Sequence, residues 1–183
     1  MRVQLVGGPV AMLVALAPAS AFATDYLSAE QAGRLMFPQA ERFEPRDIAF
    51  DTTQLQALEK DGLHPSGAHL PLMAAKRGDA TLGYVVVDEV LGKFERISYA
   101  VGIDTSGALV RVEILSYRES HGGEVRLPAW RNQFVGKTHA APLRVGEDIA
   151  NISGATLSCT HITDGIRRVV ALVDLARQQG GLR

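Results

Sequence analysis

The chain has 183 residues, of which 46% are hydrophobic and 21% charged, and its formal net charge is -1. The apolar share excludes a globally disordered protein, and the near-neutral charge argues against binding nucleic acid by neutralising phosphates. The single cysteine excludes an internal disulfide and, by itself, a structural zinc or iron–sulfur site. The length fits one domain, which we therefore expect to lack a built-in metal cluster.

Residues 1–23 have the parts of a secretory signal peptide. Arg2 supplies a positive start, residues 10–17 are apolar, and Ala21-Phe22-Ala23 has the small-x-small form of a cleavage site. The apolar stretch is shorter than the ~20 residues that a spanning helix needs. We therefore predict cleavage after Ala23 and export to the periplasm, which leaves residues 24–183 as a single domain with an N-terminal helical segment. The alternative is an uncleaved N-terminal membrane anchor.

Two helices are predicted at the start of this domain. Ser28 and Gln31 resemble a capping box, and Ala32, Leu35 and Met36 then share a helical face until Pro38 ends the helix. A second helix fits residues 52–60, with Asp51 as its N-cap and Leu55 and Leu58 pointing inward. Residues 61–72, rich in Gly, Pro and His, are predicted to form a loop.

The centre of the chain changes to strand-like patterns over residues 82–90, 94–103 and 109–117. In the second of these, Ile97, Tyr99, Val101 and Ile103 alternate with small or polar residues, which indicates a strand with one buried face. Short turns at residues 91–93 and 104–107 predict that consecutive strands pair antiparallel as a meander.

The remaining chain contains a polar loop, residues 118–137, and a C-terminal amphipathic helix from about Ser158 to Arg177. Five apolar residues at helical spacing form the buried face of this helix: Ile162, Ile166, Val169, Val170 and Val173. The predicted fold class is therefore α+β, an antiparallel sheet flanked by helices.

The most informative segment for function runs from Asp148 to Ser158. It contains Ser153, Gly154, Ala155, Thr156 and Leu157, a small-residue turn leading into the final helix. The first N–H groups of a helix are unpaired and favour a phosphate, which small residues would let approach closely. A Ser or Thr at this place is, however, more often a plain helix cap.

The sequence Ser153-Gly154-Ala155-Thr156 resembles the S-G-A-T motif of the FMN-binding domain family. This family includes the C subunit of the sodium-translocating NADH:quinone reductase and the G subunit of the Rnf electron-transport complex. The resemblance implies that a flavin transferase joins FMN to Thr156 through a phosphoester bond. It also implies that Ser153, Gly154, Ala155 and Leu157 form the phosphate turn, with Asp148 in the transferase recognition sequence.

A second segment is similar to the same family. Residues 119–124 resemble the family's E-T-P-G-L-G loop, which lies against the flavin. Glu119 and Gly122 match this pattern, whereas His121 stands where the respiratory subunits have proline. The resemblance implies that Glu119, His121 and Gly122 lie near the flavin ring. Residues 117–137 look more like the small exported single-domain members.

The resemblance implies an electron carrier or redox subunit rather than a stand-alone enzyme, because FMN performs the electron transfer and the protein positions it. No catalytic side chain is assigned. The partners implied are the flavin transferase and a membrane-bound cytochrome or electron-transport complex. Two alternatives stay open: a membrane-anchored flavin subunit of an Rnf-like or quinone-reductase-like complex, and a periplasmic binding module without redox function.

Other polar residues carry weaker signals. Cys159 and His161 are too few for a closed zinc site, so no metal site is predicted and Cys159 is expected to be buried. His64, His69 and His139 are expected to be solvent-exposed. Trp130 fits a flavin shield and a core aromatic equally well. The adjacent Arg167 and Arg168 are expected to point in different directions, with at least one of them facing solvent.

Overall fold

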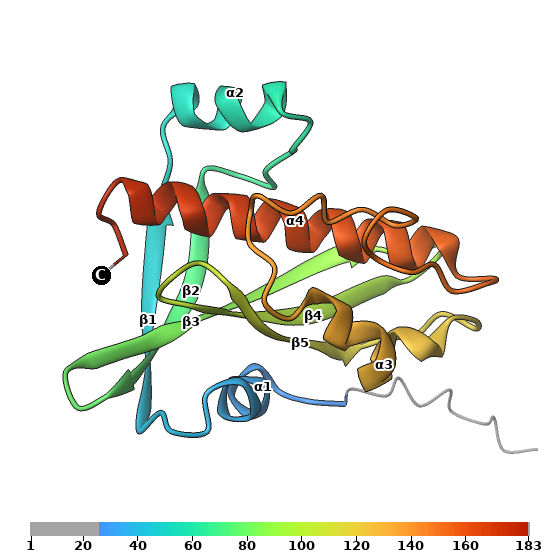
Figure 1. The fold of residues 1–183 in the computed structure, drawn as a ribbon, viewed down its shortest axis with the longest axis horizontal. Helices are drawn as coiled ribbons and strands as arrows, with labels where there is room; N and C mark the ends of the chain where they lie inside the picture. Colours follow the sequence, from blue (N-terminus) through green and yellow to red (C-terminus); the bar gives the residue numbers. More distant parts are fainter. Residues whose placement is uncertain (1–25, 183) are drawn as a thin grey trace, which may run out of the picture.

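A five-stranded antiparallel sheet organises the computed structural model of the protein, which describes residues 26–182. Its strands neighbour one another in chain order: β1 (Arg42–Ala49), β2 (His69–Arg77), β3 (Ala80–Leu91), β4 (Arg96–Asp104) and β5 (Leu109–Ser116). The α-helices of this part are α1 (Ala29–Met36), α2 (Thr52–Lys60), α3 (Pro128–Arg131) and α4 (Thr156–Gln178). In Figure 1, α4 crosses one face of the sheet and α1 lies on the other. The predicted α+β fold is confirmed, whereas the predicted signal peptide lies outside the described residues.

The first two helices begin where their capping residues predict. Ser28 Oγ accepts from the Gln31 N–H at 3.2 Å, and the Gln31 side chain accepts from the Ser28 N–H at 2.8 Å. Asp51 and Gln54 form the same reciprocal pair at the start of α2. In α1 the residues buried against the sheet include Ala32 and Met36, but Leu35 is 45% exposed.

The main core lies between the sheet and α4. All five apolar residues predicted for the buried face of α4 are buried there, against Tyr99, Val101 and Ile103 of β4. The helix begins two residues earlier than predicted, at Thr156, and ends at Gln178. Among residues 26–182, no helix is both long and apolar enough to cross a membrane.

Strand β4 is buried on both faces, which corrects the expectation of a single buried face. Ala100 and Gly102 lie beneath α1 in a second core, which also contains Met36 and Phe37. A Cβ atom on Gly102 would lie 3.0 Å from Met36 Sδ. Small residues on this face thus mark the close approach of a helix, not contact with solvent.

Two strands escape the sequence prediction because they lack strand-like patterns. β1 carries Arg42, Glu44, Pro45 and Asp47 and forms a mostly exposed sheet edge, where charges and proline discourage pairing with other chains. β2 begins at His69, so the last four residues of the loop predicted over 61–72 are instead strand.

The segment predicted as loop 118–137 contains short helical turns at residues 123–126, 128–131 and 132–134. Glu113 of β5, only 4% exposed, pairs with Arg111 and with Arg131 of α3. Arg131 also donates to the Val112 carbonyl at 2.8 Å. These contacts attach the segment to the sheet at the end where α4 begins (Figure 1).

Gly165 in the middle of α4 provides a test of this packing. Glycine to alanine in a helix normally gains about 1 kcal/mol, but a Cβ here would lie 2.0 Å from the Tyr99 hydroxyl oxygen. Tyr99 cannot move freely, since it is fully buried and donates to Asp88 at 2.6 Å. We expect Gly165→Ala to lower the free energy of unfolding by about 1–2 kcal/mol, because overpacking outweighs the helix propensity.

Chemical denaturation measures this change. The double variant Gly165→Ala, Tyr99→Phe lacks the clashing oxygen. Its free energy of unfolding should fall by less than the sum of the decreases in the two single variants. A more stable Gly165→Ala protein would contradict the packing described for this helix.

Candidate functional site

The turn at residues 153–155 leads into α4 and leaves the start of the helix open. Ala155 occupies the N-cap position and, in the described structure, no side chain caps the first turn. Gly154 has φ +81°, a left-handed conformation that an amino acid with a side chain adopts only with strain. Ser153 and Thr156 are therefore not plain helix caps, and the N–H groups of the first turn are available to an anion.

Thr156 is exposed at this open end. Its hydroxyl oxygen accepts a hydrogen bond from the Asn151 side-chain amide at 3.1 Å. Such a bond orients the oxygen while leaving its own proton free to depart. Asn151 was not among the predicted site residues, although the sequence places its amide side chain only five residues before Thr156.

A groove of about 400 Å³ adjoins Thr156. One wall comes from the predicted turn at residues 154–158, and a second from Glu119, Ser120 and His121 after β5. The third wall is the turn between β3 and β4. Its residues Lys93 and Phe94 were not among the predicted site residues. The Lys93 ammonium lies 4.9 Å from the centroid of the Phe94 ring, which is 71% exposed. The groove thus joins cationic, anion-binding and apolar groups.

Glu119 holds the β3–β4 turn in place. Its Oε1 atom accepts the backbone N–H groups of Phe94 at 2.7 Å and of Glu95 at 3.0 Å. Partial burial raises the pKa of Glu119, but the N–H groups of Phe94, Glu95 and Lys93 outweigh it, so the net pKa is lowered. Glu119 therefore lines the groove and also positions Phe94, while its place near a flavin ring stays a prediction.

This arrangement predicts a pH-dependent turn. Because the folded pKa of Glu119 is below its ordinary value of 4.5, the stabilising bonds persist above that value and weaken only as the pH falls further. We expect the amide NMR signals of Phe94 and Glu95 to titrate with a midpoint below 4.5. In Glu119→Gln this titration should vanish, and its persistence would show that another carboxyl group controls the turn.

His121 and Gly122 connect the second wall to α4. The Tyr117 hydroxyl donates to the His121 carbonyl at 2.5 Å and lies 3.3 Å from Ser158 Oγ. Burial raises the pKa of Tyr117 and so keeps it a proton donor. The exposed His121 ring lies at the groove, with Nδ1 2.9 Å from Ser120 Oγ.

Two of the predicted residues, Ser153 and Gly122, do not line the groove beside Thr156. Gly122 lies directly behind it. It is buried with φ +82°, and a Cβ on it would lie 2.1 Å from Ala155 Cβ and 2.7 Å from the Tyr117 oxygen. Its backbone therefore packs directly on the Ser153–Thr156 segment. This contact requires glycine and joins two of the three walls.

Asp148, predicted as part of the transferase recognition sequence, has a structural role outside the groove. Its carboxylate accepts the N–H groups of Leu143 and Arg144 and pairs with Lys137 at 2.9 Å. Burial raises its pKa, but the Arg144 N–H and Lys137 outweigh that effect and the net pKa is lowered. The side chain thus anchors the segment that leads to Thr156.

The weaker candidates also have clear positions. Trp130 is a core residue, since its indole N–H donates to the Ala150 carbonyl at 2.8 Å and its ring packs edge-on against Phe134. Cys159 is buried as predicted, and burial raises its pKa. Within residues 26–182 no three His, Cys, Asp or Glu residues are placed to hold a metal ion.

The other histidines and arginines considered from the sequence do not line the groove beside Thr156. His64, His69 and His139 are exposed, as predicted. Arg167 and Arg168 are both partly exposed and point in different directions, as predicted, because Arg168 pairs with Asp88 and Arg167 donates to the Gly62 carbonyl.

Comparisons with known proteins found three similarities. The sequence model of the FMN-binding domain family matches residues 92–171, a range that contains every residue lining the groove. The G subunit of the proton-translocating ferredoxin:NAD(+) oxidoreductase complex of Clostridium ljungdahlii is 27% identical over 134 residues, 69% of this chain and 72% of the relative. The crystal structure of the C subunit of Na(+)-translocating NADH-quinone reductase from Parabacteroides distasonis covers 78% of this chain and 84% of its own, with 12% identity and a TM-score of 0.45. The predicted family resemblance is confirmed.

Proposed function

We propose that this chain, whose residues 92–171 match the sequence model of the FMN-binding domain family, is an exported electron-transfer protein with FMN attached covalently to Thr156. The observation that carries the proposal is the exposed Thr156 hydroxyl at the open start of α4, beside a groove within the matched residues. FMN, when bound, supplies one- and two-electron transfer. The protein supplies the attachment point, the surroundings of the ring and protection from water.

The residues of the groove fit the chemical parts of FMN. The open N–H groups at the start of α4 suit the phosphate, and the left-handed Gly154 removes a side chain from the turn that precedes them. Phe94 and Leu157, both exposed large hydrophobic residues, offer apolar contact to the flavin ring. Lys93 adds a positive charge, and Glu119 fixes the backbone on which Lys93 and Phe94 are carried.

Covalent attachment requires a nucleophilic hydroxyl that a transferase can reach. In this step the Thr156 Oγ–phosphorus bond forms, the bond from phosphorus to the leaving group of an activated flavin nucleotide breaks, and the hydroxyl proton leaves. Ser153, Gly154, Ala155 and Leu157 would surround the resulting phosphoester. A covalent tether suits an exported protein, because FMN that dissociated outside the cytoplasm would not be replaced easily.

The proposed partner is a membrane-bound cytochrome or electron-transport complex. Support comes from the C. ljungdahlii relative, which is part of an oxidoreductase complex. Export rests on the predicted signal peptide, residues 1–23. Mass spectrometry of the protein from a periplasmic fraction should find Thr24 as the first residue. A chain that retains Met1 in membranes would favour an anchored subunit.

The function is tested by producing the protein with and without a flavin transferase. We expect a yellow protein only with the transferase, with flavin absorption retained after acid precipitation. The colour should bleach on chemical reduction and return on reoxidation. A colourless protein that takes up no flavin in either case would instead support a binding module without redox function.

A further inference from the structure

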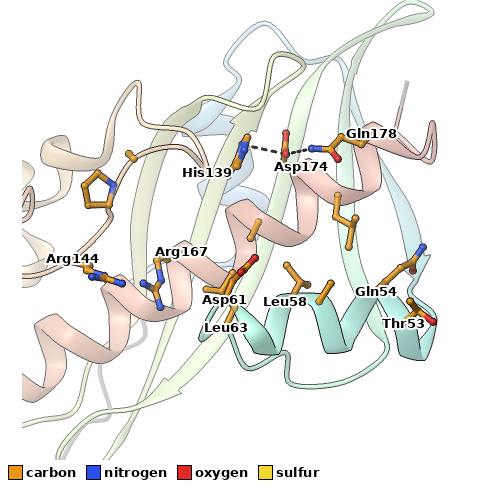
Figure 2. A pocket seen from close by; sticks show the side chains of 15 residues that line it. Thr53, Gln54, Leu58, Asp61, Leu63, His139, Arg144, Arg167, Asp174 and Gln178 are labelled. Atoms are coloured by element: carbon orange, nitrogen blue, oxygen red, sulfur yellow. Dashed lines mark hydrogen bonds and ion pairs between the residues drawn. The ribbon is translucent and has the colours of Figure 1, made fainter.

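A second and larger groove lies away from Thr156, between α2 and the C-terminal half of α4 (Figure 2). Its volume is about 700 Å³, within the range of small-molecule sites, and it shares no lining residue with the groove beside Thr156. Helix α2 contains no fully buried residue, although Leu55 and Leu58 pack partly buried against the main core. Leu58 and Leu63 form one apolar wall, and Ala171 and Leu175 of α4 form the opposite one.

One end of this groove contains a cation without a carboxylate partner. Arg167 donates from Nη2 to the Gly62 carbonyl at 3.2 Å, and its Nε atom is buried without a hydrogen-bond partner. Within the described residues it forms no ion pair, whereas the adjacent Arg168 pairs with Asp88 at 2.6 Å. A partly buried guanidinium in this state lacks the paired charge that such groups usually have.

Arg144 adds a second guanidinium to the same end of the groove. Figure 2 shows both arginine side chains at this end. The partner of Arg144 is Glu147, an exposed residue at 3.4 Å, and surface pairs of this kind are weak. The end of the groove marked by Arg144 and Arg167 is therefore suited to a negatively charged group.

The other end of the groove needs no charged ligand. There the Asp174 carboxylate is already engaged by His139 at 3.2 Å, Arg177 at 3.1 Å and Gln178 at 2.6 Å. Asp174 at this end and Asp61, which Figure 2 shows beside Leu58 and Leu63, both line the groove, so they oppose a ligand with several negative charges. These carboxylates and the apolar walls restrict the ligand to one anionic group on an apolar body.

We propose that this groove binds a small amphiphilic monoanion, an organic acid with an apolar body. Its anionic group contacts Arg167 and Arg144, and its apolar body lies between Leu58, Leu63 and Leu175. The charge selects the acid over a neutral analogue of the same length, and the apolar walls provide most of the buried surface. This site is independent of flavin attachment, since it uses none of the residues around Thr156.

Calorimetric titration of the full-length protein with octanoate and with octanol tests the proposal. Octanoate should bind saturably, and octanol at least about tenfold more weakly, because only octanoate forms charge-assisted hydrogen bonds. Arg167→Met keeps the apolar stem of the side chain and should reduce this preference at least about tenfold. Arg34→Met on α1, an exposed arginine on the other side of the sheet, is the matched control and should bind like the wild type.

A filling variant locates the apolar body. Ala171→Phe should abolish octanoate binding, and thermal unfolding should confirm that each variant is folded before titration. Absence of saturable octanoate binding to the wild type would overturn the proposal. Equal affinities of Arg167→Met and Arg34→Met, or unchanged binding in Ala171→Phe, would overturn it as well.

Discussion

Replacing Thr156 by alanine is expected to abolish covalent flavin attachment and leave the fold intact. The variant lacks the only atom of residue 156 that can form the phosphoester. Thr156 is exposed, and its side chain contacts Asn151 by one hydrogen bond, so the free energy of unfolding should change by only about 0.5 kcal/mol. Intact mass of protein produced with the transferase should show no gain of FMN less one water.

Two further variants make this experiment specific. Thr156→Ser keeps the hydroxyl and should retain attachment, whereas Thr105→Ala removes an exposed threonine in a distant turn and should be modified as the wild type. Asn151→Ala should slow attachment without preventing it, because the hydroxyl loses only its orienting partner. A flavin mass that persists in Thr156→Ala would exclude residue 156 as the attachment site.

Replacing Gly122 by alanine is expected to have the largest effect on stability. The variant would strain a backbone with φ +82° and insert a Cβ 2.1 Å from Ala155 Cβ. Strain and overpacking together should lower the free energy of unfolding by about 2–4 kcal/mol. Because the clash displaces the turn before α4, attachment of flavin to Thr156 should decrease as well. Denaturant unfolding and intact mass measure the two effects.

A matched glycine separates strain from packing. Gly146 has a similar φ of +87° but open space around it. The free energy of unfolding of Gly146→Ala should therefore fall by only about 1 kcal/mol, and flavin attachment should be normal. Adding Ala155→Gly to Gly122→Ala removes the nearest clashing atom and should recover part of the loss. If Gly122→Ala lowered the free energy of unfolding no more than Gly146→Ala does, the contact between the two walls would not contribute to stability.

Local signals in the sequence were sufficient for α1, α2 and α4, but not for the short helical turns at residues 123–134. Ser28 with Gln31 and Asp51 with Gln54 form the capping pairs that the residue types predict, and the apolar spacing of α4 identifies its buried face. Local signals were insufficient for β1, whose proline and charges are tolerated at the exposed sheet edge, and for β2, which lies between β1 and β3 although its sequence also contains a proline. Whether such a segment is loop or strand depends on its neighbours, which periodicity does not encode.

The candidate site, too, could be predicted from the sequence only in part. Thr156 and Glu119 were found through motif resemblance, and the structure places both at one groove. Lys93 and Phe94 were missed because they are far from the motif in sequence and reach the groove only through the pairing of β3 with β4. Asp148 was placed in the transferase recognition sequence through the same resemblance, and its carboxylate accepts the backbone N–H groups of Leu143 and Arg144.

The three-walled construction of the groove has a consequence for the order of events during biogenesis. The hairpins from β2 to β5 join near neighbours in the chain, so they can pair early and quickly, whereas α4 is the last element to be synthesised. The groove does not exist until α4 packs on the sheet and Ala155 meets Gly122. A transferase that requires the assembled groove would therefore modify only chains that have finished folding. A chain that carries covalent flavin would then be one that has folded completely.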